Sequence, residues 1–325
     1  MIPATAYQAP TGLRGAHLQS LLATLPLRRP LVWRRAGSTL AATCSEVLDA
    51  GGGVRLLVEH TPPPAAAPGR LAVLIHGWEG SAASLYMVSL AARLARSGFR
   101  VVRLNLRDHG DSHHLNPGIF HSCRLDEVLG ALGTLQARFA EEPLHLAGFS
   151  LGGNFALRVA ARAPAAGLRL AKAVAVCPVL DPRQTLAALD GAAPYRQYFL
   201  RKWRRSLERK RRAFPDLYDF GPLGRFRSLR EMTGYFVCHF TEFPDLDSYL
   251  RGYAITGDRL AGLEVPAEVL LADDDPVIPV GDVAGLAPGP ALTVHRSPHG
   301  GHCGFMQDWR LRSWLDEFVA RAFGA

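Results

Sequence analysis

The sequence feature that most constrains the fold is a serine between two glycines at positions 148–152, which read Gly-Phe-Ser-Leu-Gly. An apolar run over 143–147 precedes this segment, and a helix-forming run over 154–162 follows it. The pattern G-x-S-x-G between a strand and a helix is typical of a nucleophile elbow, a tight turn that exposes the serine Oγ at the end of a sheet. The sequence therefore predicts Ser150 as a nucleophile.

A serine hydroxyl needs a base to become nucleophilic, and the base needs a third group that orients it. After an elbow of this kind, the expected chain order is serine, then an acid, then histidine. Asp275 follows the apolar run 270–272, and His302 lies in the glycine-rich segment 299–305. We expect His302 to act as general base toward Ser150, and Asp275 to fix the tautomer of His302.

Neighbouring residues are alternatives for both roles. Asp275 is the last of three consecutive aspartates, and any of them would also suit a solvated loop or a helix cap. Asp275 best fits an acid followed by one residue, two apolar residues and a proline, with Asp274 as its main rival. His299 is the alternative to His302, which has the two preceding glycines and the apolar Phe305 nearby.

A second glycine-containing loop follows the apolar run 71–75 and reads His-Gly-Trp-Glu-Gly over 76–80. Such a loop can direct a backbone N–H at the oxyanion that forms during acyl transfer. We expect the N–H groups of Trp78 and Leu151 to be the two donors. Four neighbouring residues are predicted to contact the substrate: His76, Gly77, Phe149 and His109.

Four histidines cluster over 109–121, at positions 109, 113, 114 and 121. A metal site needs three or four converging ligands, whereas the adjacent His113 and His114 diverge in an extended chain. No Cys-x-x-Cys pair accompanies them. We therefore interpret this stretch as a loop near the mouth of the active site, and we expect neither a metal nor an organic cofactor.

Strand-like and helix-like runs alternate along most of the chain. Strands are predicted at 54–59, 71–75, 101–106, 144–147, 171–176, 269–272 and 292–295, and helices at 85–95, 125–139, 154–162 and from Trp309 to Val319. This alternation predicts an α/β protein with a mostly parallel central sheet flanked by helices. We expect one domain over 1–325, with an N-terminal extension over 1–38.

The alternation breaks down over 179–264, where the chain is helical, basic and aromatic. We interpret this stretch as a helical cap inserted between the sixth and seventh core strands. Within it, Arg196 to Arg212 holds nine Lys or Arg and one Glu, a local net charge of +8 that equals the net charge of the whole chain. Phe199, Leu200, Trp203 and Leu207 form an apolar stripe on this segment.

Two interpretations of the basic segment stay open. It could be an interfacial helix drawn to anionic lipid, at about 1 kcal/mol per basic residue. Alternatively, its stripe packs on the core while its arginines face water. Nothing in the chain resembles a nucleic-acid-binding signature, so we expect no nucleic-acid partner.

Composition narrows the class of protein further. A hydrophobic content of 48% and a charged content of 20% indicate a folded chain with a sizeable core. The sequence shows neither a membrane-length apolar run nor the pattern of a signal peptide. The five cysteines are scattered, which favours free thiols in a reducing compartment. We expect a cytoplasmic protein, peripheral at the inner membrane face if the basic segment binds lipid.

Taken together, these motifs resemble the α/β-hydrolase superfamily and, within it, the YheT-like branch. The matching segments are 13–22 (LRGAHLQSLL), 76–81 (HGWEGS), 120–122 (FHS), 148–153 (GFSLGG), 274–276 (DDP) and 300–302 (GGH). The resemblance implies an α/β-hydrolase fold and ester hydrolysis by a serine triad, and some relatives are membrane-associated lipid esterases or phospholipases. One departure is Asp108, where many α/β-hydrolases have glycine; aspartate tolerates the left-handed backbone better than most residues.

The resulting hypothesis is a serine hydrolase that cleaves short- to medium-chain or lipid-type carboxylic esters through an acyl-enzyme, with a role in lipid metabolism. A membrane-surface phospholipase or acyltransferase using the basic segment is the alternative. A non-catalytic binding protein would predict a lost triad member, and none is lost. The sequence does not indicate an oligomeric state.

Overall fold

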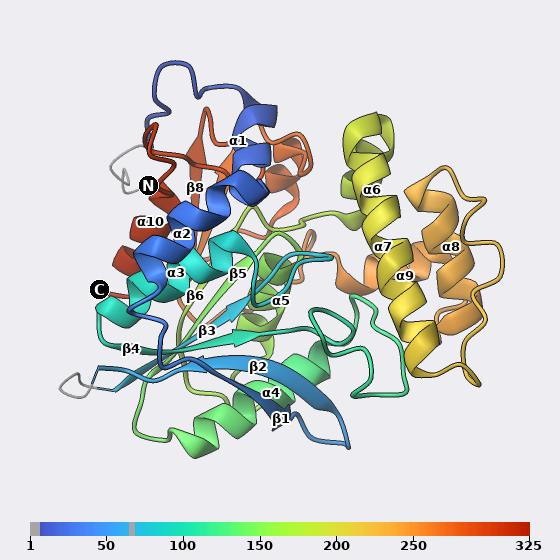
Figure 1. Ribbon diagram of the computed structural model, residues 1–325, viewed down its shortest axis with the longest axis horizontal. Helices are drawn as coiled ribbons and strands as arrows, with labels where there is room; N and C mark the ends of the chain where they lie inside the picture. The colour runs from blue at the N-terminus through green and yellow to red at the C-terminus, as the bar shows by residue number, and fades with distance from the viewer. Residues whose placement is uncertain (1–6, 65–68) are drawn as a thin grey trace.

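The computed structural model describes residues 7–64 and 69–325, which are built around one eight-stranded sheet (Figure 1). The strands are β1 (Cys44–Asp49), β2 (Arg55–Thr61), β3 (Arg70–Ile75), β4 (Phe99–Leu104), β5 (Leu144–Phe149), β6 (Leu170–Val176), β7 (Ala267–Ala272) and β8 (Leu292–Ser297). Their spatial order is β1-β2-β4-β3-β5-β6-β7-β8. β2 runs antiparallel to both β1 and β4, and all other neighbours are parallel. The predicted α/β class with a mostly parallel sheet is confirmed.

Helices cover both faces of the sheet, and this explains why its central strands are mostly apolar and buried. The helices α2 (Arg29–Ala36), α3 (Leu85–Arg96) and α10 (Trp314–Ala322) share a core with one face. On the other face, α4 (Leu125–Arg138) and α5 (Leu151–Arg162) form a second core. Every residue of β5 is buried between these two layers.

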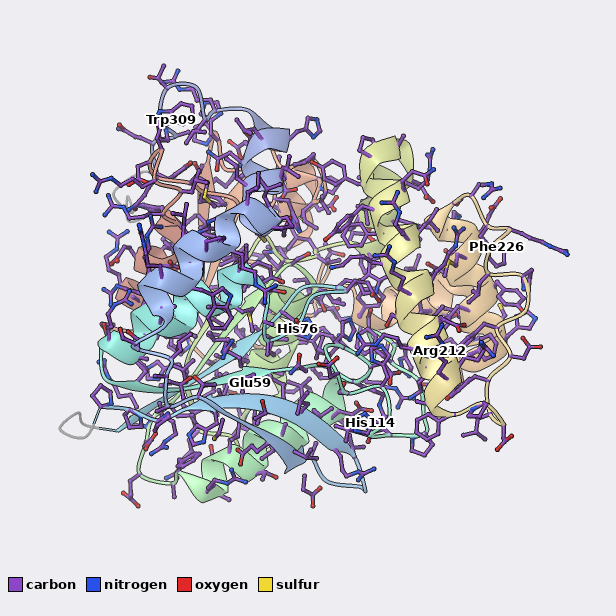
Figure 2. All side chains as sticks on the ribbon, in the orientation of Figure 1. Glu59, His76, His114, Arg212, Phe226 and Trp309 are labelled. Carbon is purple, nitrogen blue, oxygen red and sulfur yellow. The ribbon has the colours of Figure 1, made fainter. Side chains whose placement is uncertain are left out.

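β1 was not among the predicted strands, and the last helix begins later than predicted. β1 is an edge strand in which only Leu48 is fully buried, so its polar pattern gives no strand signal. With β1 counted, the strand before the insertion is the sixth. Trp309 does not belong to α10, which begins at Trp314, and it lies at the periphery with 67% of its surface exposed (Figure 2).

Residues of the predicted N-terminal extension form α1 (Ala16–Thr24), the 3-10 turn η1 (Pro26–Arg28) and α2. α2 packs against α3, and α1 also contacts α3. A further 3-10 segment, η2 (Val280–Gly285), lies between β7 and β8. No helix in the described ranges is both long enough and apolar enough to cross a bilayer.

Four helices lie between β6 and β7, where the insertion was expected, and they stand to one side of the sheet (Figure 1). They are α6 (Pro182–Gly191), α7 (Ala193–Ala213), α8 (Leu229–Phe240) and α9 (Leu246–Tyr253). The basic segment forms α7, and its stripe residues Leu200, Trp203 and Leu207 are buried. The apolar stripe of α7 therefore packs within the protein.

Several basic side chains of α7 make contacts inside the molecule. Arg204 donates to the backbone carbonyls of Leu223 and Phe226, and Lys202 donates to the backbone carbonyl of Glu79 at 2.6 Å. Glu208 pairs with arginines on the following turn of the same helix. Part of the local positive charge thus holds the insertion together and fixes it to the sheet domain.

Candidate active site

The nucleophile candidate Ser150 occupies the turn between β5 and α5, with a left-handed backbone at φ 54°. A Cβ at Gly148 would lie 2.0 Å from the carbonyl oxygen of Gly152, and a Cβ at Gly152 would lie 2.3 Å from the carbonyl oxygen of Ile75. Both glycines of the motif are therefore required by close backbone contacts. The Ser150 N–H donates to the Val176 carbonyl at 2.8 Å, which ties the turn to the end of β6.

The base and acid candidates are hydrogen-bonded to each other. His302 Nδ1 lies 2.9 Å from Asp275 Oδ2, and the Asp275 side chain is fully buried. The other oxygen, Oδ1, accepts the N–H groups of Val277 (2.8 Å) and Ile278 (3.0 Å). Because both of its oxygens are engaged, the Asp275 carboxylate is held in one orientation. It contacts Nδ1 of His302, so the other nitrogen of the imidazole, Nε2, points away from Asp275.

The rival acid, Asp274, has a different task. Its Oδ1 accepts the N–H of Gly301 at 2.9 Å, and its Oδ2 lies 3.5 Å from His299 Nδ1. Asp274 therefore supports the loop that carries His302 without contacting the His302 imidazole. The geometry places Asp275, not Asp274, beside the base.

Electrostatics favour a charged imidazole at His302. Burial opposes the charged form, but the charge of Asp275, the neighbouring Cys303 and the hydrogen bond to Asp275 together outweigh this effect, so that the pKa of His302 rises from 6.5 to about 9. A positive imidazole next to a carboxylate is the species that forms when the base takes the serine proton. The surroundings of His302 thus stabilise the positive form of its imidazole.

The N-terminal helix α1 holds the loop of His302. Ser20 Oγ accepts the His302 N–H at 2.8 Å, and Gln19 Oε1 accepts the Met306 N–H at 2.7 Å. A Cβ at Gly301 would lie 2.3 Å from the Ala16 carbonyl oxygen, so the loop approaches the helix at its glycine. The sequence analysis noted this N-terminal motif only as part of the resemblance and gave it no role at the site.

The two N–H groups predicted to bind the oxyanion come from two elements beside Ser150: that of Trp78 from the loop after β3, and that of Leu151 from the start of α5. In the loop after β3, the N–H of Gly77 donates to Tyr86 Oη (3.1 Å) and that of Glu79 to His109 Nε2 (3.2 Å). No acceptor for the N–H of Trp78 is found among the described residues. Leu151 is the first residue of α5, and its N–H has no intrahelical partner. Both N–H groups are therefore available to a ligand.

A cavity of about 90 Å³ opens at Ser150 and is lined by Trp78 and Leu151 as well. Most of its wall is apolar or aromatic and comes from α6–α9. The indole of Trp78 stacks on Phe199 of α7, with ring centroids 5.1 Å apart and planes at 7°. The insertion therefore covers the site and shapes the cavity.

The four predicted substrate contacts are not among the residues that line this cavity. His76 is fully buried: Nε2 accepts the Leu106 N–H (3.1 Å) and Nδ1 bonds the Gly77 carbonyl (2.8 Å). Gly77 and Phe149 are buried too, and His109 accepts the Glu79 N–H. These four contacts therefore stay predictions, since proximity along the chain to Ser150 or Trp78 does not say which side of the loop a residue faces.

Two residues of the Phe-His-Ser segment line the cavity instead, His121 and Ser122. The His121 side chain is 3% exposed, and neither of its nitrogens makes a hydrogen bond within the described residues, although Nε2 lies 3.4 Å from Glu242 Oε2. Burial and nearby arginines lower the pKa of His121 from 6.5 to about 4, so the imidazole is neutral. Its position in the 120–122 motif was the available signal, but the sequence analysis did not carry it to a substrate contact.

The other histidines of the 109–121 stretch are held separately. His113 Nε2 lies 2.9 Å from Ser206 Oγ of α7, whereas His114 is exposed (Figure 2). Asp108 adopts the left-handed backbone expected of it, at φ 57°, and its carboxylate turns to Lys210 of α7. The stretch thus joins the sheet domain to the insertion.

Comparison with known proteins agrees with this geometry. Residues 72–319 match the alpha/beta hydrolase family. The Escherichia coli (strain K12) protein YheT is 25% identical over 326 residues, covering 95% of this chain and 92% of YheT. Among solved structures, a serine hydrolase from Cycloclasticus zankles (TM-score 0.58, 16% identity, 87% of this chain and 98% of that chain) shares the fold. An esterase from Pyrococcus furiosus (TM-score 0.59, 14% identity, 88% and 92%) does so as well.

The match spans the loop after β3, the elbow and the loops that carry Asp275 and His302. The similarity to YheT extends over nearly the whole chain, and the predicted resemblance to the YheT-like branch is confirmed. The chain belongs to the alpha/beta hydrolase family.

Proposed function

We propose that the protein is a serine hydrolase of carboxylic esters that acts through Ser150, His302 and Asp275. The observation that carries the proposal is the fully buried Asp275 bonded to His302 Nδ1 at 2.9 Å, in a site where Ser150 occupies a strained elbow at φ 54°. The name of the relative YheT refers to an esterase, which supports the same class.

In the proposed reaction, Ser150 Oγ attacks the acyl carbonyl while His302 Nε2 takes the serine proton. The oxyanion accepts hydrogen bonds from the N–H groups of Trp78 and Leu151; losing one such donor typically costs about 2.7–4 kcal/mol of transition-state stabilisation. His302 then protonates the leaving alkoxide, and the acyl group remains on Ser150. A water molecule, deprotonated by His302, releases the acid. No step requires a cofactor.

The cavity supports a substrate with a short apolar acyl group. Its volume of about 90 Å³ is well below the ~300–1,000 Å³ of sites that hold drug-sized ligands. Leu186, Leu189 and Phe236 make one wall apolar, while neutral His121 offers a hydrogen bond to a polar substrate atom. We propose that short esters are preferred over long-chain lipids.

Hydrolysis of p-nitrophenyl acetate, butyrate, octanoate and palmitate by wild type and Ser150→Ala tests the proposal. We expect turnover of the short esters by wild type and a loss of at least ~10⁴-fold in kcat for Ser150→Ala. Labelling by a fluorophosphonate provides the control, since it needs an activated serine but no particular ester. Labelling at Ser150 without turnover would contradict the substrate class, and neither labelling nor turnover would favour a non-catalytic binding protein.

A second candidate is peripheral binding to an anionic membrane, from which a lipid-type ester would reach the site. Arg201 and Arg205 of α7 favour it, since both are exposed and have no described ion pair. Arg205 also borders a second cavity of about 550 Å³, which is lined by Arg29, Lys202 and Arg209 as well. The scattered free thiols are consistent with the cytoplasmic location that we propose.

Cosedimentation with phosphatidylglycerol and phosphatidylcholine vesicles separates the two candidates. If α7 binds the surface, the double variant Arg201→Ala/Arg205→Ala is expected to bind anionic vesicles ~30-fold more weakly, at about 1 kcal/mol per residue. Arg34→Ala/Arg162→Ala, two exposed arginines on α2 and α5, is the charge-matched control. Equal binding by both double variants would contradict the membrane candidate.

A further inference from the structure

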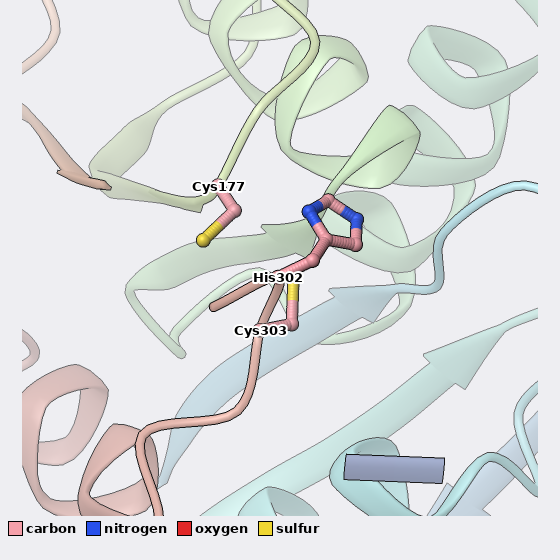
Figure 3. A group of neighbouring side chains, drawn as sticks. All are labelled: Cys177, His302 and Cys303. Carbon is pink, nitrogen blue, oxygen red and sulfur yellow. The ribbon is translucent and has the colours of Figure 1, made fainter. Parts of the chain in front are cut away.

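Two buried cysteines lie beside the imidazole of His302, on segments far apart in the chain (Figure 3). Cys177 directly follows β6, and Cys303 directly follows His302. The two Sγ atoms and an imidazole nitrogen of His302 all lie within 4.8 Å of one another. The two cysteines have no role in the proposed ester hydrolysis, whereas His302 is its base.

The hydrogen bonds of both thiols are weak, and each thiol is a partner of the other. Cys177 Sγ lies 3.9 Å from the Gly301 carbonyl oxygen, and Cys303 Sγ lies 3.8 Å from the Val176 carbonyl oxygen. Both cysteines hold left-handed backbones, at φ 44° and φ 57°. The fold therefore keeps two weakly bonded thiols next to the base at the cost of local backbone strain.

Two thiolates and one imidazole are the ligand set that zinc and similar soft divalent ions prefer. Zn–S bonds of about 2.3 Å at a tetrahedral angle place two sulfurs roughly 3.8 Å apart. With a Zn–N bond of about 2.0–2.1 Å, sulfur and nitrogen lie roughly 3.5 Å apart, so separations within 4.8 Å would have to shorten by at most about 1.0 Å between the sulfurs and about 1.3 Å between sulfur and nitrogen.

We propose that Cys177, Cys303 and His302 bind a zinc-type ion, and that the bound ion inhibits the hydrolase by occupying its base. On binding, each thiol loses one proton to solvent and forms a metal–sulfur bond, and no electron is transferred. His302 needs Nδ1 for Asp275 and Nε2 for the serine proton, so coordination through either nitrogen excludes its catalytic role. The ion is an inhibitor here and not a cofactor, so the proposed mechanism remains free of metal.

Metal binding is measured directly and then through activity, because only the second readout rests on the proposed function. With a phosphine reductant present to prevent disulfide formation, Co²⁺ is titrated as an optical probe, and Zn²⁺ is measured by equilibrium dialysis. We expect one ion per chain, a sulfur-to-cobalt charge-transfer band in the near ultraviolet, and inhibition of ester hydrolysis that a chelator reverses.

Variants identify the ligands. Cys177→Ser and Cys303→Ser are each expected to weaken Zn²⁺ binding by more than ~10-fold, as even an indirect ligand contact typically contributes that much. His302→Gln tests the imidazole by the same dialysis measurement and needs no activity. Cys238→Ser removes an exposed thiol outside the cluster and is the matched control.

The outcomes are distinct. Unchanged Zn²⁺ affinity in both Cys177→Ser and Cys303→Ser, with thermal melts showing that both are folded, would overturn the proposal and place any inhibition on the triad alone. Binding without inhibition would overturn its second half. If no ester is hydrolysed but the cobalt band appears and depends on both cysteines, the metal site stands while the proposed function fails.

Discussion

Lys210 Nζ lies 2.8 Å from Asp108 Oδ1, and the two side chains are only 1% and 6% exposed. Lys210 also donates to the carbonyls of Asn116 (2.6 Å) and Gly118 (2.9 Å), and the other Asp108 oxygen accepts the Phe120 N–H (2.8 Å). The pair joins α7 of the insertion to the loop after β4. Lys210, which belongs to the most basic segment of the chain, is thus buried in an internal ion pair. This pair also explains why an aspartate stands at position 108, where many α/β-hydrolases have glycine.

Lys210→Met is expected to destabilise the protein by about 3–5 kcal/mol, because it leaves the Asp108 carboxylate buried without its cation. Urea unfolding followed by circular dichroism measures the loss. Arg212→Met, which removes an exposed pair with Glu208 on the same helix, is the control and is expected to change little. The double variant Lys210→Met/Asp108→Asn should regain part of the loss, and a Lys210→Met protein as stable as wild type would contradict the buried pair.

The assignment of the acid predicts unequal effects of two adjacent substitutions. Asp275→Asn should lower kcat by ~10⁴-fold, because the amide no longer holds the imidazole in the correct tautomer. Asp274→Asn retains an oxygen that can accept the Gly301 N–H and should lower kcat by less than ~10-fold. Steady-state kinetics on one short ester decide the matter, and the reverse order of effects would assign the role to Asp274.

The raised pKa of His302 predicts an alkaline activity profile. Only the neutral imidazole accepts the serine proton, so kcat/KM should increase by about tenfold per pH unit and level off near pH 9. Stability follows the opposite trend: because the folded pKa lies above the ordinary value of 6.5, the stabilisation is full below pH 6.5 and is lost as the pH rises to about 9. A pH–rate profile that levels off below pH 7 would contradict the raised pKa of His302.

The contact between α1 and the His302 loop predicts an effect on catalysis from a residue outside the triad. Ser20→Ala removes the acceptor of the His302 N–H, and the expected result is a decrease of ~10-fold in kcat with little change in KM. Thr24→Ala, on the exposed end of the same helix, is the matched control. Wild-type kcat in a folded Ser20→Ala protein would show that the loop holds its position without α1.

Local sequence patterns were sufficient to predict the structure where one contiguous segment determines its own conformation. The elbow at Ser150 is such a case, because its glycines, strand and helix are contiguous, and the order of Asp275 and His302 follows from the same fold. β1 was missed because an edge strand needs little burial, and only Leu48 in it is fully buried. The contact of Ser20 with His302, the Lys210–Asp108 pair and the thiols beside His302 depend on long-range approach, which no local pattern encodes.

The same long-range approach has a consequence during protein synthesis. Ser20 and His302 are separated by 282 residues, so a nascent chain carries its elbow long before the residues that complete the base are made. Contacts of such sequence separation form late and slowly in folding. In the proposed reaction, a partly translated chain that lacks Asp275 and His302 therefore holds a serine that cannot be activated.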